Sequence, residues 1–461
     1  LSDAELLIYG TTRATNAIVE NQTAKTAFLT TAGFPDILTL REGGRTDAHD
    51  FSVDYPAAYI PRHRTVEIPE RINAEGGIET ALDEVITRDR LMQLRDRQFE
   101  AIAVCFLWSV ANPSHELRMG ELIKEILPGL PYTLSHQLLP IVREYRRAST
   151  TAIDASLKPL MQSHLQQMET DLREAGFQGD LLVSSSAGGC MKVATAIDAP
   201  IATAKSGPAM APVAAKTYAA LEALGGDVIV CDTGGTTFDV GLVHADEIVF
   251  TRDTWIGGQY TGHLIANSTV DIRSLGAGGG SIAWVDAGGL LNVGPQSAGS
   301  EPGPACYGRG GTQPTVTDAA AVLGYLNPEK FLGGRMALDI DAARQAVASV
   351  GDSLNKNTEE TAWAILKIAD ELMIKAIHEI TVVEGFNPQD AAIIAGGGAA
   401  GLNIMPIAAE LGVSRVVLPK MAGALSAVGM QYADIVGEES GTALTTSQQF
   451  NYQGVNRLLD N

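Results

Sequence analysis

One turn constrains the fold of this chain more than any other feature. Residues 228–243 read VIVCDTGGTTFDVGLV, so two aliphatic runs flank a turn that contains two glycines and two threonines. Apolar runs on both sides of a glycine turn predict a buried β-hairpin. In the first 140 residues, short apolar runs alternate with helical stretches. This alternation predicts an α/β architecture.

The remaining elements follow from hydrophobic periodicity and from cap residues. The longest helix is expected at 358–384, where apolar residues recur every three or four positions and Asn357 with Glu360 forms a capping box. A strand–turn–strand pattern like that of the hairpin is also expected near residue 10. We expect further strands at 26–31, 101–108, 391–395 and 413–419, and a strand followed by a polar turn at 181–189. We also expect further helices at 113–127 (capped by Ser114), 141–175 (kinked or broken at Pro159), 208–225 and 423–433, and a long loop at 297–319.

Composition excludes several classes of function. The chain has 461 residues, with 54 acidic against 33 basic side chains and a net charge of −21, which argues against nucleic acid or an anionic membrane as partner. Four cysteines lie far apart without a CxxC pair, which predicts a reducing, cytoplasmic location and no zinc site. The longest uncharged run, 391–409, contains three consecutive glycines and Pro406, so it fits a strand, turn and helix better than a membrane span.

The hairpin turn carries the residue types that bind phosphate. Gly234 and Gly235 let backbone N–H groups approach an anion closely, and Thr236 and Thr237 add hydroxyl donors. The flanking carboxylates, Asp232 and Asp239, could hold Mg²⁺ through water, because hard cations prefer oxygen ligands. An ordinary hairpin turn is the alternative. We interpret the turn as a phosphate cradle.

A second glycine turn, AIIAGGGAAG at 392–401, lies between an expected strand and a helix N-terminus. That position suits a nucleotide, although glycines also permit close packing of a helix on a strand. The sequence contains neither the GxxxxGK[ST] pattern nor a dinucleotide fingerprint that follows a strand.

These two turns, in this order, resemble the actin, sugar-kinase and chaperone-ATPase superfamily, in which two ribonuclease-H-like domains close over a nucleotide cleft. Longer strings then resemble the A subunit of the hydantoinase/oxoprolinase family. They are YGTTRATNAIVENQTAKTAFLTTAGFPDILTLR (9–41), IPRHRTVEIPERINAEGG (60–77), REYRRASTTAIDASLKP (143–159), KSGPAM (205–210), CDTGGTTFDV (231–240), LGAGGGSIAWVD (275–286), GPQSAGSEPGPACYGRGG (294–311), LGYLNPEKFLGG (323–334) and AGALSAVGMQYADI (422–435). Because these strings cover nearly the whole chain, it is identified as a member of that family.

The resemblance implies a role for each matching residue. It implies catalytic roles for Asp232, Thr236, Asp239, Glu144 and Arg146, with Asp232 also at the metal. It implies cofactor binding by Gly234, Gly235, Thr237, Gly278, Gly279, Gly280, Gly396, Gly397, Gly398, Gly10, Thr11 and Thr12. Glu144, Arg146, Ser149 and Thr150 are placed near the substrate. For these four and for the polar members of the glycine-rich loop, a capping or loop-bracing role is an equal alternative.

The resemblance also implies organisation and activity. It gives an actin-like domain at 1–205 with a helical linker at 141–175, a second actin-like domain at 206–435, and the start of a C-terminal region at 436–461. The implied reaction uses ATP and Mg²⁺ to phosphorylate the carbonyl oxygen of a cyclic amide or imide, of the hydantoin or oxoproline type. Water then opens the ring, with release of ADP and phosphate. The implied partner is a B-type subunit in a hetero-oligomer.

Three departures from the family pattern leave rival functions open. The first phosphate hairpin of the family, which precedes the GTT segment, does not occur in the sequence. Asn403 and Arg273 stand where relatives often carry histidine. The rivals are a ketone carboxylase subunit that phosphorylates an enol, a sugar or small-molecule kinase, and a non-catalytic scaffold with an ATPase fold.

Overall fold

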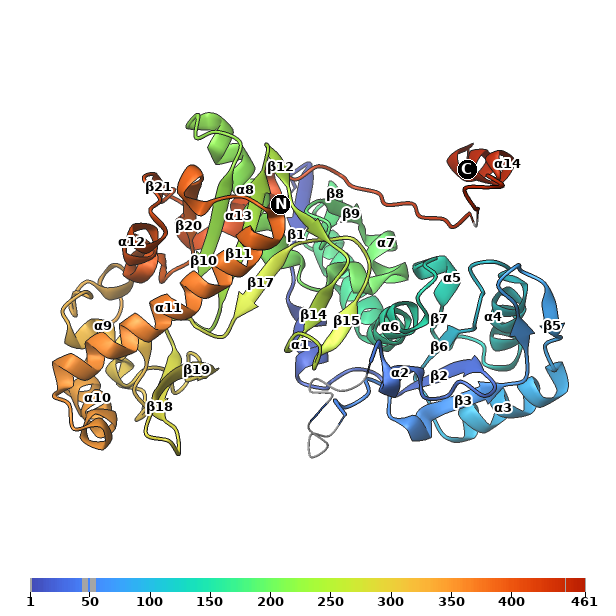
Figure 1. Ribbon diagram of the computed structural model, residues 1–461, viewed down its shortest axis with the longest axis horizontal. Coiled ribbons are helices and arrows are strands. Elements are labelled where there is room, and N and C mark those ends of the chain that lie inside the picture. The colour runs from blue at the N-terminus through green and yellow to red at the C-terminus, as the bar shows by residue number, and fades with distance from the viewer. Residues whose placement is uncertain (1, 44–48, 50–54, 444, 461) are drawn as a thin grey trace. The chain divides into compact units, whose positions relative to one another are not determined.

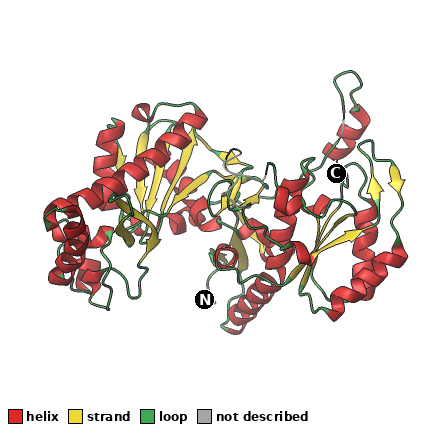
Figure 2. Ribbon diagram, turned by 60° about the horizontal axis from the view of Figure 1, so that its bottom comes forward, coloured by secondary structure: helices red, strands yellow, loops and turns green. Residues whose placement is uncertain are grey.

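Both units of the computed structural model are built from separate stretches of chain (Figure 1). The structure describes residues 2–43, 49, 55–443 and 445–460. The first unit contains Leu1–Ser206, Thr251–Thr269 and Asp434–Asn461, and the second contains Gly207–Phe250 and Val270–Ala433. In each unit helices cover the strands (Figure 2). The predicted α/β class is confirmed, and the predicted domain boundaries stay a prediction.

The second unit is organised around one sheet of six strands. Their bounds are β10 Val228–Thr233, β11 Phe238–His244, β12 Glu247–Ile248, β17 Ile272–Leu275, β20 Ala392–Gly396 and β21 Val416–Val417. The order is β12-β11-β10-β20-β21, and β17 also pairs with β11. β10 and β11 form the predicted antiparallel hairpin, whereas β20 and β21 continue the sheet in parallel with β10. An antiparallel meander followed by parallel strands is the ribonuclease-H-like topology expected for the second domain.

Successive residues of β10 point to opposite faces of this sheet, and each face has its own helices. Ile229 and Cys231 pack under α11 (Thr358–Glu384) and α12 (Ala400–Leu411), while Val228 and Val230 pack under α8 (Ser206–Leu221) and α13 (Leu425–Tyr432). α8 and α13 are in backbone contact, since a side chain at Gly429 would overlap the carbonyl of Met210. A separate cluster joins α9 (Val316–Val322), α10 (Ile340–Leu354), β18 (Ser281–Val285) and β19 (Leu291–Ser297).

The first unit contains a parallel sheet in the order β3-β2-β6-β7. Its strands are β2 Thr26–Thr31, β3 Thr65–Ile68, β6 Ala101–Cys105 and β7 Tyr132–Leu134. α3 (Glu84–Asp96) and α4 (Ser114–Ile126) cover one face, and α6 (Glu144–Glu174) covers the other. The opposite side of α6 packs on the β1-β8-β9 sheet, formed by β1 Leu6–Tyr9, β8 Asp180–Ser184 and β9 Cys190–Lys192.

Shorter elements connect these layers. They are α1 Arg13–Val19, α2 Ile37–Leu40, β4 Arg71–Ile72, β5 Ile78–Thr80, α5 Ser135–Leu138, α7 Val193–Asp198, β13 Phe250–Thr251, β14 Thr254–Ile256, β15 His263–Ile265, β16 Thr269–Val270 and α14 Tyr452–Asp460. None of the helices within the described residues is both long enough and apolar enough to cross a bilayer.

Several predicted elements need correction. Ser114 is the first residue of α4 and makes no capping bond, because Pro113 occupies the N-cap. α6 continues unbroken through Pro159. The turn after residue 10 leads into helix α1, not a strand. The strand at 101–108 ends at Cys105, and the one at 413–419 shrinks to Val416–Val417. The expected loop at 297–319 contains the 3₁₀ turn Ala305–Tyr307 and the start of α9.

Candidate functional site

The hairpin turn of the second unit presents backbone donors to solvent. Gly234 N–H donates to the carbonyl of Thr237 at 2.9 Å and closes the turn. Gly235 and Thr236 are exposed, and their N–H groups meet no backbone acceptor among the described residues. A Cβ on Gly235 would meet nothing within 4 Å. The tip of the turn therefore has both the free donors and the space that an anion needs.

Two carboxylates face each other at the base of this turn. Asp232 on β10 is paired in register with Asp239 on β11, so both side chains lie on one face of the hairpin. Burial and the negative charge of Asp239 raise the pKa of Asp232 to about 6, against a hydrogen bond from Ser426 that lowers it. Thr237 Oγ1 donates to Asp239 Oδ2 at 3.3 Å.

A divalent cation would relieve the repulsion between these two carboxylates. No group of three or more His, Cys, Asp or Glu side chains suited to a metal occurs in the described part of the chain. Mg²⁺ commonly takes only one or two carboxylates and completes its shell with water and phosphate oxygens. The Asp232–Asp239 pair therefore fits Mg²⁺ better than a metal that requires a full set of protein ligands.

The glycine-rich loop at 276–281 packs directly against the hairpin turn. Gly279 N–H donates to Gly234 O at 3.1 Å, and Gly280 N–H donates to Gly235 O at 2.6 Å. A Cβ on Gly278 would lie 2.7 Å from the backbone of Thr236. The loop is fixed from behind by Thr317 on α9, whose hydroxyl donates to Gly279 O at 2.7 Å. Side chains are excluded here because two stretches of backbone touch.

The second glycine turn lies beside the first. β20 pairs in parallel with β10, with Gly396 opposite Asp232. Gly397 has φ +90°, and a Cβ there would overlap the carbonyl oxygen of Thr233. Gly398, in contrast, faces open space, and α12 begins two residues later. Thus three glycine segments that are far apart in sequence meet at one end of the sheet in the second unit.

Asn403, one of the departures from the family pattern that the sequence indicated, is buried in α12. Its side chain hydrogen-bonds Asp370 of α11, and its Oδ1 has no hydrogen-bond partner within the described residues. Burial raises the pKa of Asp370 to about 7, although Lys367 and Asn403 act in the other direction.

The remaining predicted site residues lie in the first unit. Gly10, Thr11 and Thr12 form the turn between β1 and α1, where Thr11 Oγ1 accepts from Arg13 N–H at 3.1 Å. Thr12 Oγ1 accepts from Asn16 at 3.4 Å. Both hydroxyls therefore brace the start of α1.

The Glu144–Thr150 stretch forms the start of α6. Arg146 donates to Glu42 at 2.9 Å and also pairs with Asp253. Ser149 donates to Leu264 O at 2.8 Å, and Thr150 Oγ1 accepts from Ala266 N–H at 3.1 Å. Three of the four side chains that the sequence placed near a substrate thus hold neighbouring segments of the first unit. Their bonds favour the bracing alternative, and the catalytic role of Arg146 stays a prediction.

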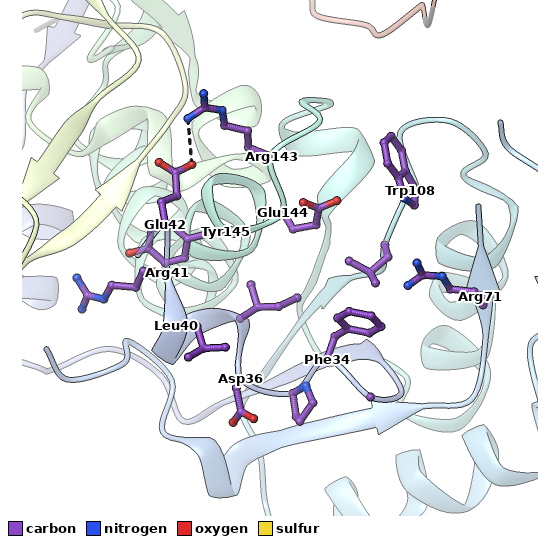
Figure 3. Close-up of a pocket in the computed structure, with 14 residues that line it drawn as sticks. Phe34, Asp36, Leu40, Arg41, Glu42, Arg71, Trp108, Arg143, Glu144 and Tyr145 are labelled. Atoms are coloured by element: carbon purple, nitrogen blue, oxygen red, sulfur yellow. Dashed lines mark ion pairs between the residues drawn. The ribbon is translucent and has the colours of Figure 1, made fainter. Parts of the chain in front are cut away.

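Glu144 differs from these neighbours because it lines a cavity of about 610 Å³ in the first unit (Figure 3). The lining is Gly33, Phe34, Pro35, Asp36, Ile37, Leu40, Arg41, Glu42, Arg71, Leu107, Trp108, Arg143, Glu144 and Tyr145. Sequence reasoning missed Phe34, Arg71 and Trp108. The available sequence signal was that these three residues lie just after β2, β3 and β6, but no motif marks those positions.

Residues 147–439 match the hydantoinase/oxoprolinase family, and residues 1–127 match the hydantoinase/oxoprolinase N-terminal region. The chain belongs to the hydantoinase/oxoprolinase family, as the sequence strings predicted.

Among its relatives, the caprolactamase alpha subunit of Pseudomonas jessenii is 37% identical over 94% of this chain and 62% of its own length. The acetophenone carboxylase gamma subunit of Aromatoleum aromaticum is 33% identical over 94% of this chain and 60% of its own. The chain also resembles the crystal structure of the ATP-dependent caprolactamase from Pseudomonas jessenii, with a TM-score of 0.83 and 36% identity, over 94% of this chain and 62% of that one. This chain therefore spans less than two thirds of the length of each of these relatives.

Proposed function

We propose that this chain binds Mg·ATP at the three glycine segments of the second unit and takes part in the ATP-dependent ring opening of a cyclic amide. The observation that supports this most is the meeting of the hairpin turn, the 276–281 loop and the 396–398 turn around Asp232 and Asp239. The relative named as a caprolactamase supports a cyclic amide as the substrate class.

In this proposal each group of the site has one task. The free N–H groups of Gly235 and Thr236 and the hydroxyl of Thr236 would hold phosphate oxygens, and the hydroxyl of Thr237 would join them by turning away from Asp239. Asp232 and Asp239 would hold Mg²⁺. Gly398 leaves room for adenosine at the second turn. Fixed donors and a cation that are aimed at phosphate oxygens lower the barrier to phosphoryl transfer by positioning and charge stabilisation.

When bound, ATP would supply a phosphoryl group to the amide oxygen, which makes the amide carbon electrophilic enough for water to add. The ring opens when the C–N bond breaks and the nitrogen takes a proton, and a second water then removes the phosphoryl group. The products are then the ring-opened acid, ADP and phosphate.

Asp232→Asn tests the proposal. It keeps the shape of the side chain but removes the charge that would hold Mg²⁺. Mg²⁺-dependent ATP binding, followed by calorimetry, is expected to weaken at least tenfold, and ATP hydrolysis is expected to fall to background. Asp352→Asn, an exposed position on α10, is the control and should change neither. Unchanged Mg·ATP affinity in Asp232→Asn, in a folded protein, would remove the assignment.

Two parts of the proposal concern chemistry beyond this chain. The named alpha and gamma subunits among the relatives support work with a second, B-type subunit in a hetero-oligomer. The acetophenone carboxylase relative favours a second candidate, in which an enol is phosphorylated and then carboxylated. Incorporation of labelled bicarbonate into the product would support carboxylation, whereas incorporation of oxygen from labelled water would support hydrolysis.

A further inference from the structure

The cavity of the first unit lies where an α/β sheet offers a binding site. Its parallel strands lie in the order β3-β2-β6-β7. The chain therefore runs from β2 to β3 on one side of β2, and then crosses to β6 on the other side of β2. Ligands of such sheets bind outside the carboxyl ends of the strands, at this change of direction. Phe34 follows β2, Arg71 follows β3, and Leu107 and Trp108 follow β6. All of them line the cavity.

The wall of the cavity is mostly apolar, and part of it is strained. Phe34, Leu107 and Trp108 line the cavity from the ends of two neighbouring strands. Trp108 has φ +57°, which bulky residues rarely adopt and which tends to occur at functional sites. Cavities of this size with aromatic and aliphatic walls are typical of small-molecule sites.

Most charged groups at the cavity are already paired within the described residues. Glu42 is bound by Arg146 and Arg143, and Asp36 is bound by Arg62 at 3.0 Å. Arg41 donates to main-chain carbonyls of Tyr260, Gly262 and Ala57, while its Nε is buried without a hydrogen-bond partner among the described residues. These contacts fix the rim and leave Arg41 only its Nε for a ligand.

Arg71 and Glu144 are the exceptions. Arg71 Nη1 is buried and has no hydrogen-bond partner among the described residues, while its guanidinium stacks 5.0 Å from the centre of the Phe34 ring. Its Nε lies 3.9 Å from Glu79, so only one side of the group is engaged. Glu144, in the first turn of α6, has no hydrogen bond or ion pair to another described residue, although its charge acts on the guanidinium of Arg147. Both side chains point toward the same space in Figure 3. Besides Arg41 Nε, the cavity thus offers one buried unpaired donor, Arg71 Nη1, and one acceptor, Glu144, between mostly apolar walls.

We propose that this cavity binds a compact, mainly apolar molecule with a secondary amide, whose C=O accepts from Arg71 and whose N–H donates to Glu144. A lone carboxylate would pair with Arg71 but lie against the charge of Glu144, and a lone ammonium group would pair with Glu144 but lie against the charge of Arg71. A ketone would pair with Arg71 but leave Glu144 unpaired in an apolar pocket, which is costly. That this ligand is the substrate rests on the proposed function. Glu144, which the sequence singled out, thereby becomes the residue that distinguishes an amide from a ketone.

Ligand-observed NMR titration of the protein without nucleotide tests the inference with two matched probes. ε-Caprolactam carries both amide groups, and cycloheptanone has the same ring with CH₂ in place of N–H. The lactam is expected to bind at least tenfold more tightly. Glu144→Leu should weaken lactam binding by about tenfold to hundredfold and bring the two probes to similar affinities. Arg71→Met should weaken both probes, because both have a carbonyl.

Two further variants keep the result interpretable. Glu144→Gln retains one acceptor oxygen and should lose less lactam affinity than Glu144→Leu. Glu174→Leu changes an exposed glutamate at the other end of the same helix and should bind both probes like the wild type. Lactam binding that is indifferent to Glu144→Leu and Arg71→Met would overturn the inference, as would tighter binding of the ring-opened amino acid or of cycloheptanone.

Failure of this inference and failure of the proposed function are separate results. Lactam binding with the expected dependence on Glu144, in a protein that does not bind Mg·ATP, supports the cavity and overturns the proposed function. Mg·ATP binding without any saturable lactam binding overturns the cavity assignment alone.

Discussion

At the scale of the residue, Asp370 links stability to pH. Its folded pKa of about 7 lies well above the value of about 3.9 for an unfolded chain. Between these values the folded state binds more protons, so the contribution of Asp370 to the free energy of unfolding falls as pH rises from about 4 to 7. Asp370→Asn removes this dependence. We expect it to gain up to about 3 kcal/mol over the wild type at pH 8 and little at pH 4, measured by urea denaturation. An equal shift at both pH values would contradict the argument.

Two adjacent glycines should respond very differently to alanine. At Gly397 the added Cβ overlaps Thr233 O in a backbone with φ +90°, whereas at Gly398 it meets open space. We expect Gly397→Ala to cost about 3 kcal/mol or more, and Gly398→Ala to change stability by less than about 1 kcal/mol. Because adenosine is proposed to occupy the space at Gly398, that variant should weaken Mg·ATP binding instead. Thermal unfolding and nucleotide titration of both variants separate the two effects. Equal destabilisation would contradict the observed geometry.

At the scale of the element, the capping box of α11 makes a measurable contribution. The Asn357 side chain accepts from Glu360 N–H at 2.8 Å, and Glu360 accepts in return from Asn357 N–H. Asn357→Ala should lower the free energy of unfolding by about 1 kcal/mol. Lys375→Ala on an exposed face of the same helix, where it meets Glu379 at 3.8 Å, should change it by less than about 0.5 kcal/mol. Denaturation of the two variants side by side gives the comparison.

The sequence predicted both ends of α11 correctly, because the apolar period and the capping-box residues Asn357 and Glu360 indicate the same helix. It mispredicted a break at Pro159 because the cost of a helix-interior proline, about 3 kcal/mol, is outweighed by packing. α6 buries Ala152 against the parallel sheet and Ile153 and Leu157 against the other sheet. Local helix propensity does not include the packing that stabilises a helix covered on both sides.

The two candidate sites were not equally visible from the sequence. Glycine and aspartate types mark the hairpin turn, so Asp232, Gly234 and Gly235 could be singled out one by one. Arg71 and Trp108 have no such mark. They meet only because the strand order brings the ends of β3 and β6 to either side of β2. Periodicity predicts strands but does not give their order in a sheet.

At the scale of the whole molecule, the net charge of −21 should make stability depend on salt. Excess like charge destabilises a folded chain by self-repulsion, and salt screens it. The thermal unfolding temperature should therefore rise by a few degrees as NaCl increases from about 10 mM, and should level off near 0.1 M, where the Debye length reaches about 10 Å. Calorimetry at fixed pH measures this. A flat or falling curve at low salt would contradict the prediction.

The interleaved course of the chain has a consequence for biosynthesis. The β1-β8-β9 sheet of the first unit gains its last backbone bonds when Cys190 N–H donates to Asp434 O and Val436 N–H donates to Cys190 O. Both partners emerge from the ribosome more than two hundred residues after Cys190, with nearly all of the second unit in between. The N-terminal unit cannot reach its final form during its own translation. Its open sheet is thus a nascent-chain surface that a holdase could recognise until residue 436 has been released.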